Sequence, residues 1–373
     1  MRDLLSYLQQ HQEDLLSDLR RLVEIESPSA HPERVEAVMD VVSGWMAELG
    51  AQERRFASPN GDHRHYVLEG QSSERVLILA HADTVWPVGT LERLPFRLEG
   101  DRAYGPGSYD MKAGVVQAVW ALRALRQQGE LPRTVELLLT SDEEIGSETS
   151  KDVIRELAQG AERVLVVEPS NPETGTLKTA RKGVGYFTVS VEGRAAHAGG
   201  QPERGVNAIL ELARQAIALS ELARPELGTT LSVGQIRGGT ATNVIPAFAT
   251  MEVDLRVTRL DEAARVEAAA AALRPVDERA RLILEGGLER PPFERTEGTA
   301  RLFEQARLLA AELGYELGEA ASGGGSDGNY TAPIAPTLDG LGACGDGAHA
   351  DHEHVIVPEM PRRAALLAGL IAR

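Results

Sequence analysis

Three short apolar runs of this sequence each end in side chains that can bind a metal ion. The runs cover residues 75–80, 135–140 and 163–167. The side chains that follow them are, in chain order, His81 and Asp83, the pair Glu143 and Glu144, and Glu168. Imidazole and carboxylate groups together form a nitrogen and oxygen ligand set that suits zinc and related divalent ions. The pattern therefore indicates a metal site.

Two further segments can add ligands to that site. Asp110 directly precedes a helical stretch, so it is either the N-cap of that helix or another ligand. His349 lies in a Gly-rich segment, but His352 and His354 follow it closely. Spacing alone does not decide which of these three histidines binds a metal.

The chemistry that such a set supports best is hydrolysis. Two ions about 3.5–4 Å apart, bridged by Asp110, would lower the pKa of a water between them and polarise a scissile carbonyl. A spare carboxylate must then carry a proton from the water to the leaving nitrogen. The pair Glu143 and Glu144 offers one acid for the metal and one for the proton. Asp83 is placed to accept the second imidazole N–H of His81.

Each of these residues also has an ordinary structural explanation. A histidine after a strand is commonly a polar loop residue, and adjacent glutamates such as Glu143 and Glu144 are usually a solvated pair. What distinguishes the pattern is that three successive buried runs end in such groups. The carboxyl ends of parallel strands meet at one edge of a sheet, where ligands bind in open α/β folds.

The elements that must position these groups form an α/β domain. The three apolar runs are short and almost wholly apolar, which is typical of strands buried on both faces. A helical stretch, 111–128, lies between the first and the second run. Strands that alternate with helices predict a mostly parallel sheet.

A different pattern begins near residue 179. The order β-α-β-β-α-β predicts a ferredoxin-like unit, with elements at 184–191, 202–222, 229–237, 247–258, 261–273 and 281–285. We therefore expect a catalytic domain in two parts, residues 1–178 and 291–373, with an inserted dimerisation or lid domain at 179–290. An exposed edge strand of the inserted domain would favour a homodimer.

The amino-acid composition limits the kinds of molecule that the protein is expected to bind. The 373 residues are 42% hydrophobic and 25% charged, which fits a globular protein. A net charge of −17 argues against binding to nucleic acid or to an anionic membrane. No stretch approaches the roughly 18 apolar residues of a membrane span. The single cysteine, Cys344, cannot form an internal disulfide, so we expect a cytoplasmic location.

The motifs around these residues resemble those of the co-catalytic zinc aminoacylase and carboxypeptidase family, which includes acetylornithine deacetylase, succinyl-diaminopimelate desuccinylase and glutamate carboxypeptidases. The resemblance runs nearly end to end and is strongest to the glutamate carboxypeptidase branch. Its motifs in the first part are His81–Val85, Gly105–Gly114, Thr140–Ser147 and Val167–Ser170. Those that follow are Arg181–Gly183, Gly193–Gly199, Gly205–Ala208 and Ser326–Asn329.

The resemblance implies a role for each metal-site residue. One zinc ion would be held by His81 and Glu168, the other by Glu144 and His349, with Asp110 as the bridge. Glu143 would act as general base and then as general acid, and Asp83 would orient His81. In relatives the peptide bond after the bridging aspartate is cis.

The resemblance also implies roles for three residues of the inserted domain. His197 would reach the active site of a partner subunit and stabilise the oxyanion, Arg256 would bind the substrate carboxylate, and Asn243 would contact the substrate. From the residues alone, the same side chains could be a loop histidine, a surface charge and a turn residue. A guanidinium is nevertheless a suitable anchor for a carboxylate, because it can bind it bidentately.

These features together predict a metallohydrolase with two divalent ions, expected to be zinc. It would release a C-terminal amino acid, with glutamate expected, from an N-acyl amino acid, a folyl-type conjugate or a short peptide with a free carboxylate. The first alternative is a deacylase of the acetylornithine or succinyl-diaminopimelate type. The alternative that is not an enzyme is a non-catalytic relative that keeps the fold as a binding module.

Overall fold

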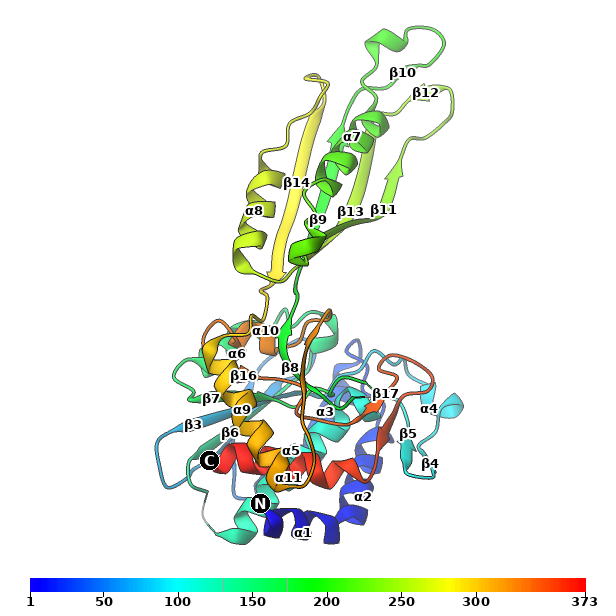
Figure 1. Ribbon diagram of the computed structural model, residues 1–373. Coiled ribbons are helices and arrows are strands. Elements are labelled where there is room, and N and C mark those ends of the chain that lie inside the picture. Colours follow the sequence, from blue (N-terminus) through cyan, green and yellow to red (C-terminus); the bar gives the residue numbers. More distant parts are fainter. Residues whose placement is uncertain (130, 173) are drawn as a thin grey trace. The chain divides into compact units, whose positions relative to one another are not determined.

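The computed structural model describes residues 1–129, 131–172 and 174–373, which form two compact units (Figure 1). Unit 1 consists of Met1–Ala180, Arg295–Ser322 and Ser326–Arg373. Unit 2 consists of Arg181–Glu294 and Gly323–Gly325. Each unit has its own hydrophobic core.

Unit 1 is built on a six-stranded sheet. In spatial order its strands are β1 (Gln52–Phe56), β2 (His63–Leu68), β6 (Thr134–Thr140), β3 (Arg75–His81), β7 (Arg163–Val166) and β16 (Thr337–Leu338). The four strands from β6 to β16 run parallel to their neighbours, while β2 is antiparallel to β6 and β1 is antiparallel to β2. The α/β class with a mostly parallel sheet is therefore confirmed.

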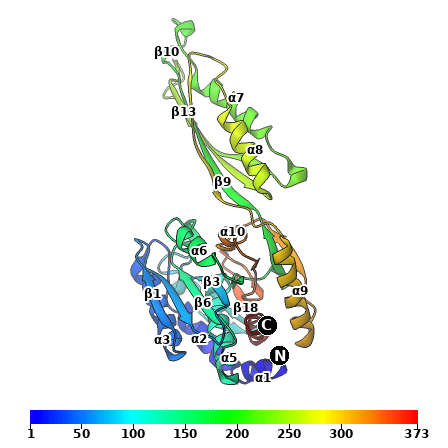
Figure 2. The same cartoon turned by 90° about the vertical axis from the view of Figure 1, so that its left-hand side faces the viewer.

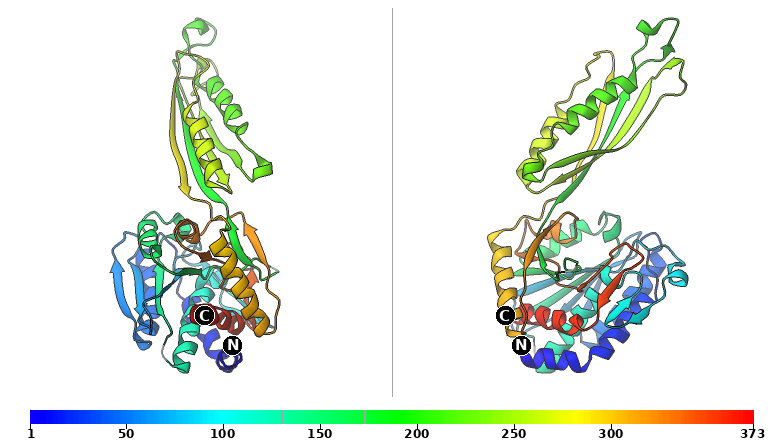
Figure 3. Two further views of the ribbon diagram at one scale, coloured as in Figure 1. Left: turned by 60° about the vertical axis from the view of Figure 1, so that its left-hand side comes forward. Right: turned by 45° about the vertical axis from the view of Figure 1, so that its right-hand side comes forward.

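Helices bury both faces of this sheet, which is why its central strands are mostly apolar. One face is covered by α1 (Arg2–Gln10), α2 (Gln12–Val23), α3 (Pro32–Glu48), α5 (Ala113–Gln128), α9 (Glu297–Glu312) and α11 (Glu359–Ala372). The blue α1 and the red α11 pack side by side (Figure 3). The other face is covered by α6 (Lys151–Ala158) and α10 (Gly328–Thr331).

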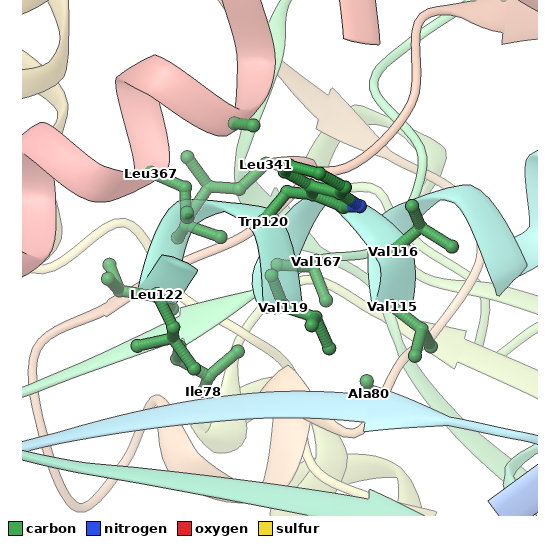
Figure 4. Packing of buried hydrophobic residues seen from close by; sticks show 14 of the residues in the cluster. Ile78, Ala80, Val115, Val116, Val119, Trp120, Leu122, Val167, Leu341 and Leu367 are labelled. Carbon is green, nitrogen blue, oxygen red and sulfur yellow. The ribbon is translucent and has the colours of Figure 1, made fainter. Parts of the chain in front are cut away.

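Helix α5 shows how the core holds the sheet. Val115 and Val119 lie on the side of α5 that faces β3, with Val115 above Ala80, while Trp120 lies on the opposite side of the helix (Figure 4). Helix α5 is therefore buried on all sides. Its packing holds the carboxyl end of β3, which carries the candidate ligand His81.

A second, four-stranded sheet of unit 1 joins two distant segments of the chain. Its order is β17 (Gly345–Asp346), β18 (His354–Ile356), β5 (Arg102–Tyr104) and β4 (Arg97–Glu99). Beyond β4 and β5 the unit adds α4 (Thr90–Arg93) and the pair β15 (Glu319–Ser322) and β8 (Leu177–Arg181). Because β18 pairs with β5, the loop that carries His349 lies beside the turn that carries Asp110.

Unit 2 has the predicted β-α-β-β-α-β order. Its main elements are β9 (Gly183–Glu192), α7 (Ala208–Ser220), β11 (Thr230–Gly238), β13 (Phe248–Val257), α8 (Leu260–Ala271) and β14 (Arg281–Arg290). The antiparallel sheet has the order β11-β13-β9-β14, and α7 and α8 lie on the same face of it (Figure 2). A short ladder joins β10 (Ala196–His197) to β12 (Val244–Ile245).

Two sequence expectations change in detail. The helix predicted over 202–222 begins only at Ala208, because the side chain of Asn207 caps it by accepting a hydrogen bond from the Leu210 N–H. The last strand is longer than predicted and extends from Arg281 to Arg290. Within the described ranges, every helix is too short or too polar to cross a bilayer.

Candidate metal centre

Three neighbouring parallel strands deliver candidate ligands to one edge of the unit 1 sheet. β3 ends at His81, and β7 ends two residues before Glu168. β6 ends just before a single 3-10 turn that contains Glu143 and Glu144. Because β6, β3 and β7 are adjacent and parallel, their carboxyl ends lie together.

Asp110 lies between two histidines and presents a different oxygen to each. Its Oδ1 is 3.3 Å from Nε2 of His81, and its Oδ2 is 3.4 Å from Nε2 of His349. His81 Nε2 is also 3.4 Å from a carboxylate oxygen of Glu168, and His349 Nε2 is 3.2 Å from one of Glu144. The five side chains therefore form two half-sites, each with one histidine and one glutamate, that share Asp110.

The structure bears on the two alternatives that spacing left open. Asp110 is not the N-cap of α5, because Lys112 occupies that position and makes no side-chain capping bond. The Asp110–Met111 peptide bond is cis, as in the resembled family. His354 is buried, with its ring on the main-chain oxygen of His352, so His349 is the histidine that faces Asp110.

Asp83 contacts more of the site than the sequence suggested. Nδ1 of His81 lies 3.0 Å from the main-chain oxygen of Asp83 and 3.5 Å from its carboxylate. The carboxylate accepts hydrogen bonds from the Ser29 hydroxyl at 2.6 Å and from the backbone N–H groups of Glu143 and Glu144 at 3.3 and 3.1 Å. Asp83 therefore contacts both the imidazole and the main chain of the glutamate pair, a position that residues behind metal ligands commonly take.

Glu353 is a residue that sequence reasoning missed. Its buried carboxylate accepts four hydrogen bonds, from the backbone N–H groups of Gly107 (2.8 Å), Tyr109 (2.9 Å) and Asp110 (3.0 Å) and from the indole N–H of Trp86 (2.7 Å). It thus holds the turn on which Asp110 sits. No sequence spacing rule connects residues 243 positions apart, so the only signal was an acid close to His349.

The electrostatics of the centre favour a positive charge. Hydrogen bonds to Asp110 and Glu144 raise the pKa of His349 to about 10. Burial lowers the pKa of His81, but contact with Asp110 and the neighbouring carboxylates outweighs it and holds that pKa well above its usual value. Burial, with the charge of Asp110 nearby, raises the pKa of Glu144 to about 8. Although burial alone would raise the pKa of Asp110, both histidines hold it well below its usual value.

The orphaned atoms of the site match what a metal ion needs. Nε2 of His81 and Oδ1 of Asp110 are buried, and although they lie 3.3 Å apart, neither has the geometry of a hydrogen bond with the other or with any other described residue. Both are ligand-type atoms, and an unpaired buried polar atom costs about 1–3 kcal/mol. Ligand atoms of His81, Asp110 and Glu144 lie within 4.8 Å of one another, as do those of His81, Glu143 and Glu168. The residues present therefore fit divalent metal ions.

Of the three candidate residues in unit 2, the structure brings two together. His197 is exposed and pairs with Val244 in the β10–β12 ladder, and the main-chain oxygen of Asn243 accepts a hydrogen bond from Ala198. Arg256 lies at the other end of β13, eight residues beyond Phe248, which corresponds to roughly 27 Å of strand. Its guanidinium pairs with Asp254 at 3.0 Å.

Comparison with known proteins agrees with this geometry. A family model described as Peptidase family M20/M25/M40 matches residues 77–373. The chain belongs to this family. It is a metallohydrolase that acts on amide bonds.

Relatives of this M20 peptidase include a carboxypeptidase and a desuccinylase. The chain is 33% identical to carboxypeptidase G2 of Pseudomonas sp. (strain RS-16), covering 96% of this chain and 88% of that protein. It is 29% identical to succinyl-diaminopimelate desuccinylase of Xylella fastidiosa (strain 9a5c), covering 96% and 97%. Aminopeptidase PepT of Bacillus cereus superimposes with a TM-score of 0.82 at 24% identity over 97% of this chain and 98% of that one, a likeness of fold alone.

Proposed function

We propose that this M20 peptidase holds two divalent ions, with zinc as the expected metal, and releases a C-terminal amino acid from an N-acyl amino acid, a folyl-type conjugate or a short peptide. Glutamate is the expected leaving amino acid. The observation that carries the proposal is that Asp110 turns one oxygen to His81 and the other to His349. One bridging carboxylate between two half-sites is the arrangement that a dinuclear centre needs.

In this proposal His81 and Glu168 hold one ion, Glu144 and His349 hold the other, and Asp110 bridges them. When bound, the ions supply an activated water and polarise the scissile carbonyl. Glu143 takes a proton from that water and passes it to the leaving nitrogen. Its position supports the role, because its carboxylate lies within 4.8 Å of the ligand atoms of His81 and Glu168. Asp83 keeps Glu143 in place through the Glu143 N–H.

The substrate carboxylate is assigned to Arg256, and contacts near the scissile bond to His197 and Asn243. The adjacency of His197 to the Asn243 segment supports a common role for these two residues. The separation of Arg256 from them along β13 means that a carboxylate bound by Arg256 and an oxyanion bound by His197 of the same protomer would lie far apart. If His197 instead acts in the active site of a second protomer, the two groups that contact one substrate come from different protomers, and their separation along β13 no longer matters.

We further propose a homodimer formed through unit 2, and a cytoplasmic location. Ile209, Ala213 and Ile217 follow one another at four-residue spacing on the exposed face of α7, and Ile217 is 63% exposed. This apolar stripe lies beside β11, which is an edge strand of the sheet. An unpaired edge next to an apolar helix face is a surface that a second copy can cover.

Complementation between variants tests the shared site. In a mixture of Glu143→Gln and His197→Ala proteins, a heterodimer contains one site with Glu143 of one protomer and His197 of the other. We expect activity well above that of either variant alone after the subunits exchange. If mixing regains no activity although exchange is demonstrated, His197 does not act in the partner's site.

A deacylase of the acetylornithine or succinyl-diaminopimelate type is the second candidate function, because several relatives carry the succinyl-diaminopimelate desuccinylase name. Both candidates need the same metal centre and differ in the groups on either side of the amide. A non-catalytic relative is the least supported reading, because family membership and a Glu143 beside the ligand set argue for catalysis.

The experiment that tests the function combines metal analysis with a substrate panel. Protein purified without chelator should contain close to two zinc, cobalt or manganese ions per chain. The metal-loaded protein should cleave folyl- or peptidyl-glutamate faster than N-acetylornithine and N-succinyl-diaminopimelate. The reverse order of rates would favour the deacylase, and protein that binds no metal and cleaves nothing would refute both.

A further inference from the structure

A hollow of about 290 Å³ lies in unit 1, and none of the candidate metal ligands is among the described residues that line it. The volume is just below the range of roughly 300–1,000 Å³ that is usual for small-molecule sites, which suits a ligand about as large as an amino acid. The residues that line the hollow include Tyr315, Glu316, Cys344, Glu359, Arg362 and Arg363.

The charged side chains of the hollow balance one another. Two glutamates and two arginines line it, so the net charge of its wall is zero. Arg362 donates a hydrogen bond to Glu359 at 2.6 Å, and these two charges therefore compensate each other. Glu316 is exposed and has no ion pair within the described ranges of the chain. One negative charge of the wall is thus left without a partner.

Arg363 supplies the matching positive charge. Its side chain is 1% exposed, and its guanidinium donates to the main-chain oxygens of Gly342 (3.0 Å), Gly175 (3.1 Å) and Gly340. These oxygens satisfy N–H groups but carry no net charge, and a guanidinium stays protonated in proteins. Among the residues that the structure describes, the charge of Arg363 has no carboxylate partner.

Tyr315 adds a hydrogen-bond donor without an acceptor. Its hydroxyl oxygen is buried and makes no hydrogen bond to any residue that the structure describes. Burial raises the pKa of Tyr315 to about 12, so the hydroxyl keeps its proton at neutral pH. A buried donor without an acceptor is unfavourable, and a carboxylate oxygen is a strong acceptor for it.

The rest of the wall is apolar and already ordered. Leu317, Ile356 and the thiol of Cys344 line the hollow. The N–H of Ile356 donates to the main-chain oxygen of Cys344 at 2.8 Å, and the hydroxyl of Ser170 donates to that of Ala343 at 3.0 Å. A wall that is held in this way does not need to be ordered when a ligand binds, so more of the contact energy remains for binding.

We infer that this hollow is a binding site for a free α-amino acid with an apolar side chain, separate from the metal centre. The carboxylate of the ligand meets the charge of Arg363 and the hydroxyl of Tyr315, and its ammonium group meets Glu316. A ligand with one charge of a single sign would leave either Glu316 or Arg363 uncompensated. The inference goes beyond the proposed function, because the metal centre contributes no residue to it.

Calorimetry on the full-length, metal-loaded protein tests the charge requirement. L-Leucine should bind. 4-Methylpentanoate lacks the ammonium group and 3-methylbutylamine lacks the carboxylate, so each should bind at least about tenfold more weakly than L-leucine. L-Glutamate, whose second carboxylate meets no further unpaired cation, should be weakened to a similar degree.

The thiol of Cys344 reports where the ligand binds. Cys344 is the single cysteine of the chain and lines the hollow, so its alkylation by iodoacetamide, followed by mass spectrometry, measures access to this site. At L-leucine concentrations about ten times the Kd, mass action predicts a roughly tenfold slower alkylation. If L-leucine binds but leaves this rate unchanged, it binds elsewhere and the inference is wrong.

Two substitutions assign the two charges of the ligand. Glu316→Gln should weaken L-leucine at least about tenfold and leave 4-methylpentanoate nearly unchanged. Tyr315→Phe should weaken L-leucine and 4-methylpentanoate but not 3-methylbutylamine. Glu13→Gln is the matched control, since Glu13 is also exposed, belongs to unit 1 and does not line the hollow. Circular dichroism and thermal unfolding confirm that each variant is folded.

The outcomes are independent of those for the metal centre. Equal binding of L-leucine and its two singly charged analogues, or no binding of L-leucine at all, would overturn the amino-acid site and leave the hydrolase intact. Protein that binds no metal and cleaves nothing, yet still protects Cys344 with L-leucine, would refute only the proposed function.

Discussion

Replacing Glu353 by glutamine should loosen the metal centre although Glu353 is not one of the candidate ligands. Its two carboxylate oxygens each accept two hydrogen bonds, one oxygen from Trp86 and Gly107, the other from Tyr109 and Asp110. A glutamine can place an oxygen at only one of these positions. Whichever way it turns, its NH2 group faces two N–H donors, so two hydrogen bonds to a charged acceptor are lost.

The structure allows the size of the effect to be worked out. Hydrogen bonds to charged groups are worth about 1.5–3 kcal/mol each, so the loss of two sets an upper range of about 3–6 kcal/mol for the metal-free protein. Part of this cost is recovered as the turn relaxes, and that movement displaces Asp110. Residues that orient metal ligands typically change metal affinity about 10–100-fold when they are replaced. We expect a loss of this size for Glu353→Gln.

The assay is a competition between the protein and a chromophoric chelator, with the visible spectrum of the cobalt-loaded protein as a second readout. Glu211→Gln is the matched control, because Glu211 is also buried and accepts hydrogen bonds from the backbone N–H groups of Val276 (2.8 Å) and Asp277 (3.1 Å). This variant should be destabilised but should bind metal normally. Trp86→Phe removes a single donor and should have a smaller effect.

One result would refute this reasoning. If Glu353→Gln lowers the thermal unfolding temperature as Glu211→Gln does, but keeps the wild-type metal affinity and cobalt spectrum, then Glu353 supports the fold and does not position Asp110. An unchanged KM with a reduced kcat at saturating metal would instead agree with a displaced bridging carboxylate.

Three further predictions follow from the same structure. Glu143→Gln should retain both ions by metal analysis and lose about 10²–10⁴-fold in kcat; near-normal turnover would exclude the proton-transfer role. Ile217→Asp should shift the sedimentation coefficient from dimer to monomer, and a wild-type protein that is a fully active monomer would contradict the proposed interface. A hydrogen bond from Arg265 lowers the pKa of Glu262 from 4.5 to about 2, so the stability from this group is fully present above about pH 4.5 and is lost as the pH falls through about 2. The difference in unfolding temperature between wild type and Glu262→Gln should therefore shrink over that interval, and a difference independent of pH would count against the pairing.

The sequence by itself determined which segments form the central sheet and which side chains follow the strands. Apolar runs and helical periodicity depend on residues that are close in the chain, so they predicted β3, β6 and β7 and placed His81, Glu144 and Glu168 after them. The β-α-β-β-α-β order of unit 2 could be predicted from the sequence for the same reason. The family motifs then suggested roles that local patterns do not contain.

Only the tertiary structure decided how distant groups meet. The pairing of β18 with β5 brings His349 and Glu353 to the turn of Asp110, which made His349 the facing histidine and excluded Asp110 as a helix cap. The length of β13 likewise separates Arg256 from His197. These outcomes depend on contacts between segments more than two hundred residues apart, or on the run of a whole strand, and no local pattern of side chains encodes such distances.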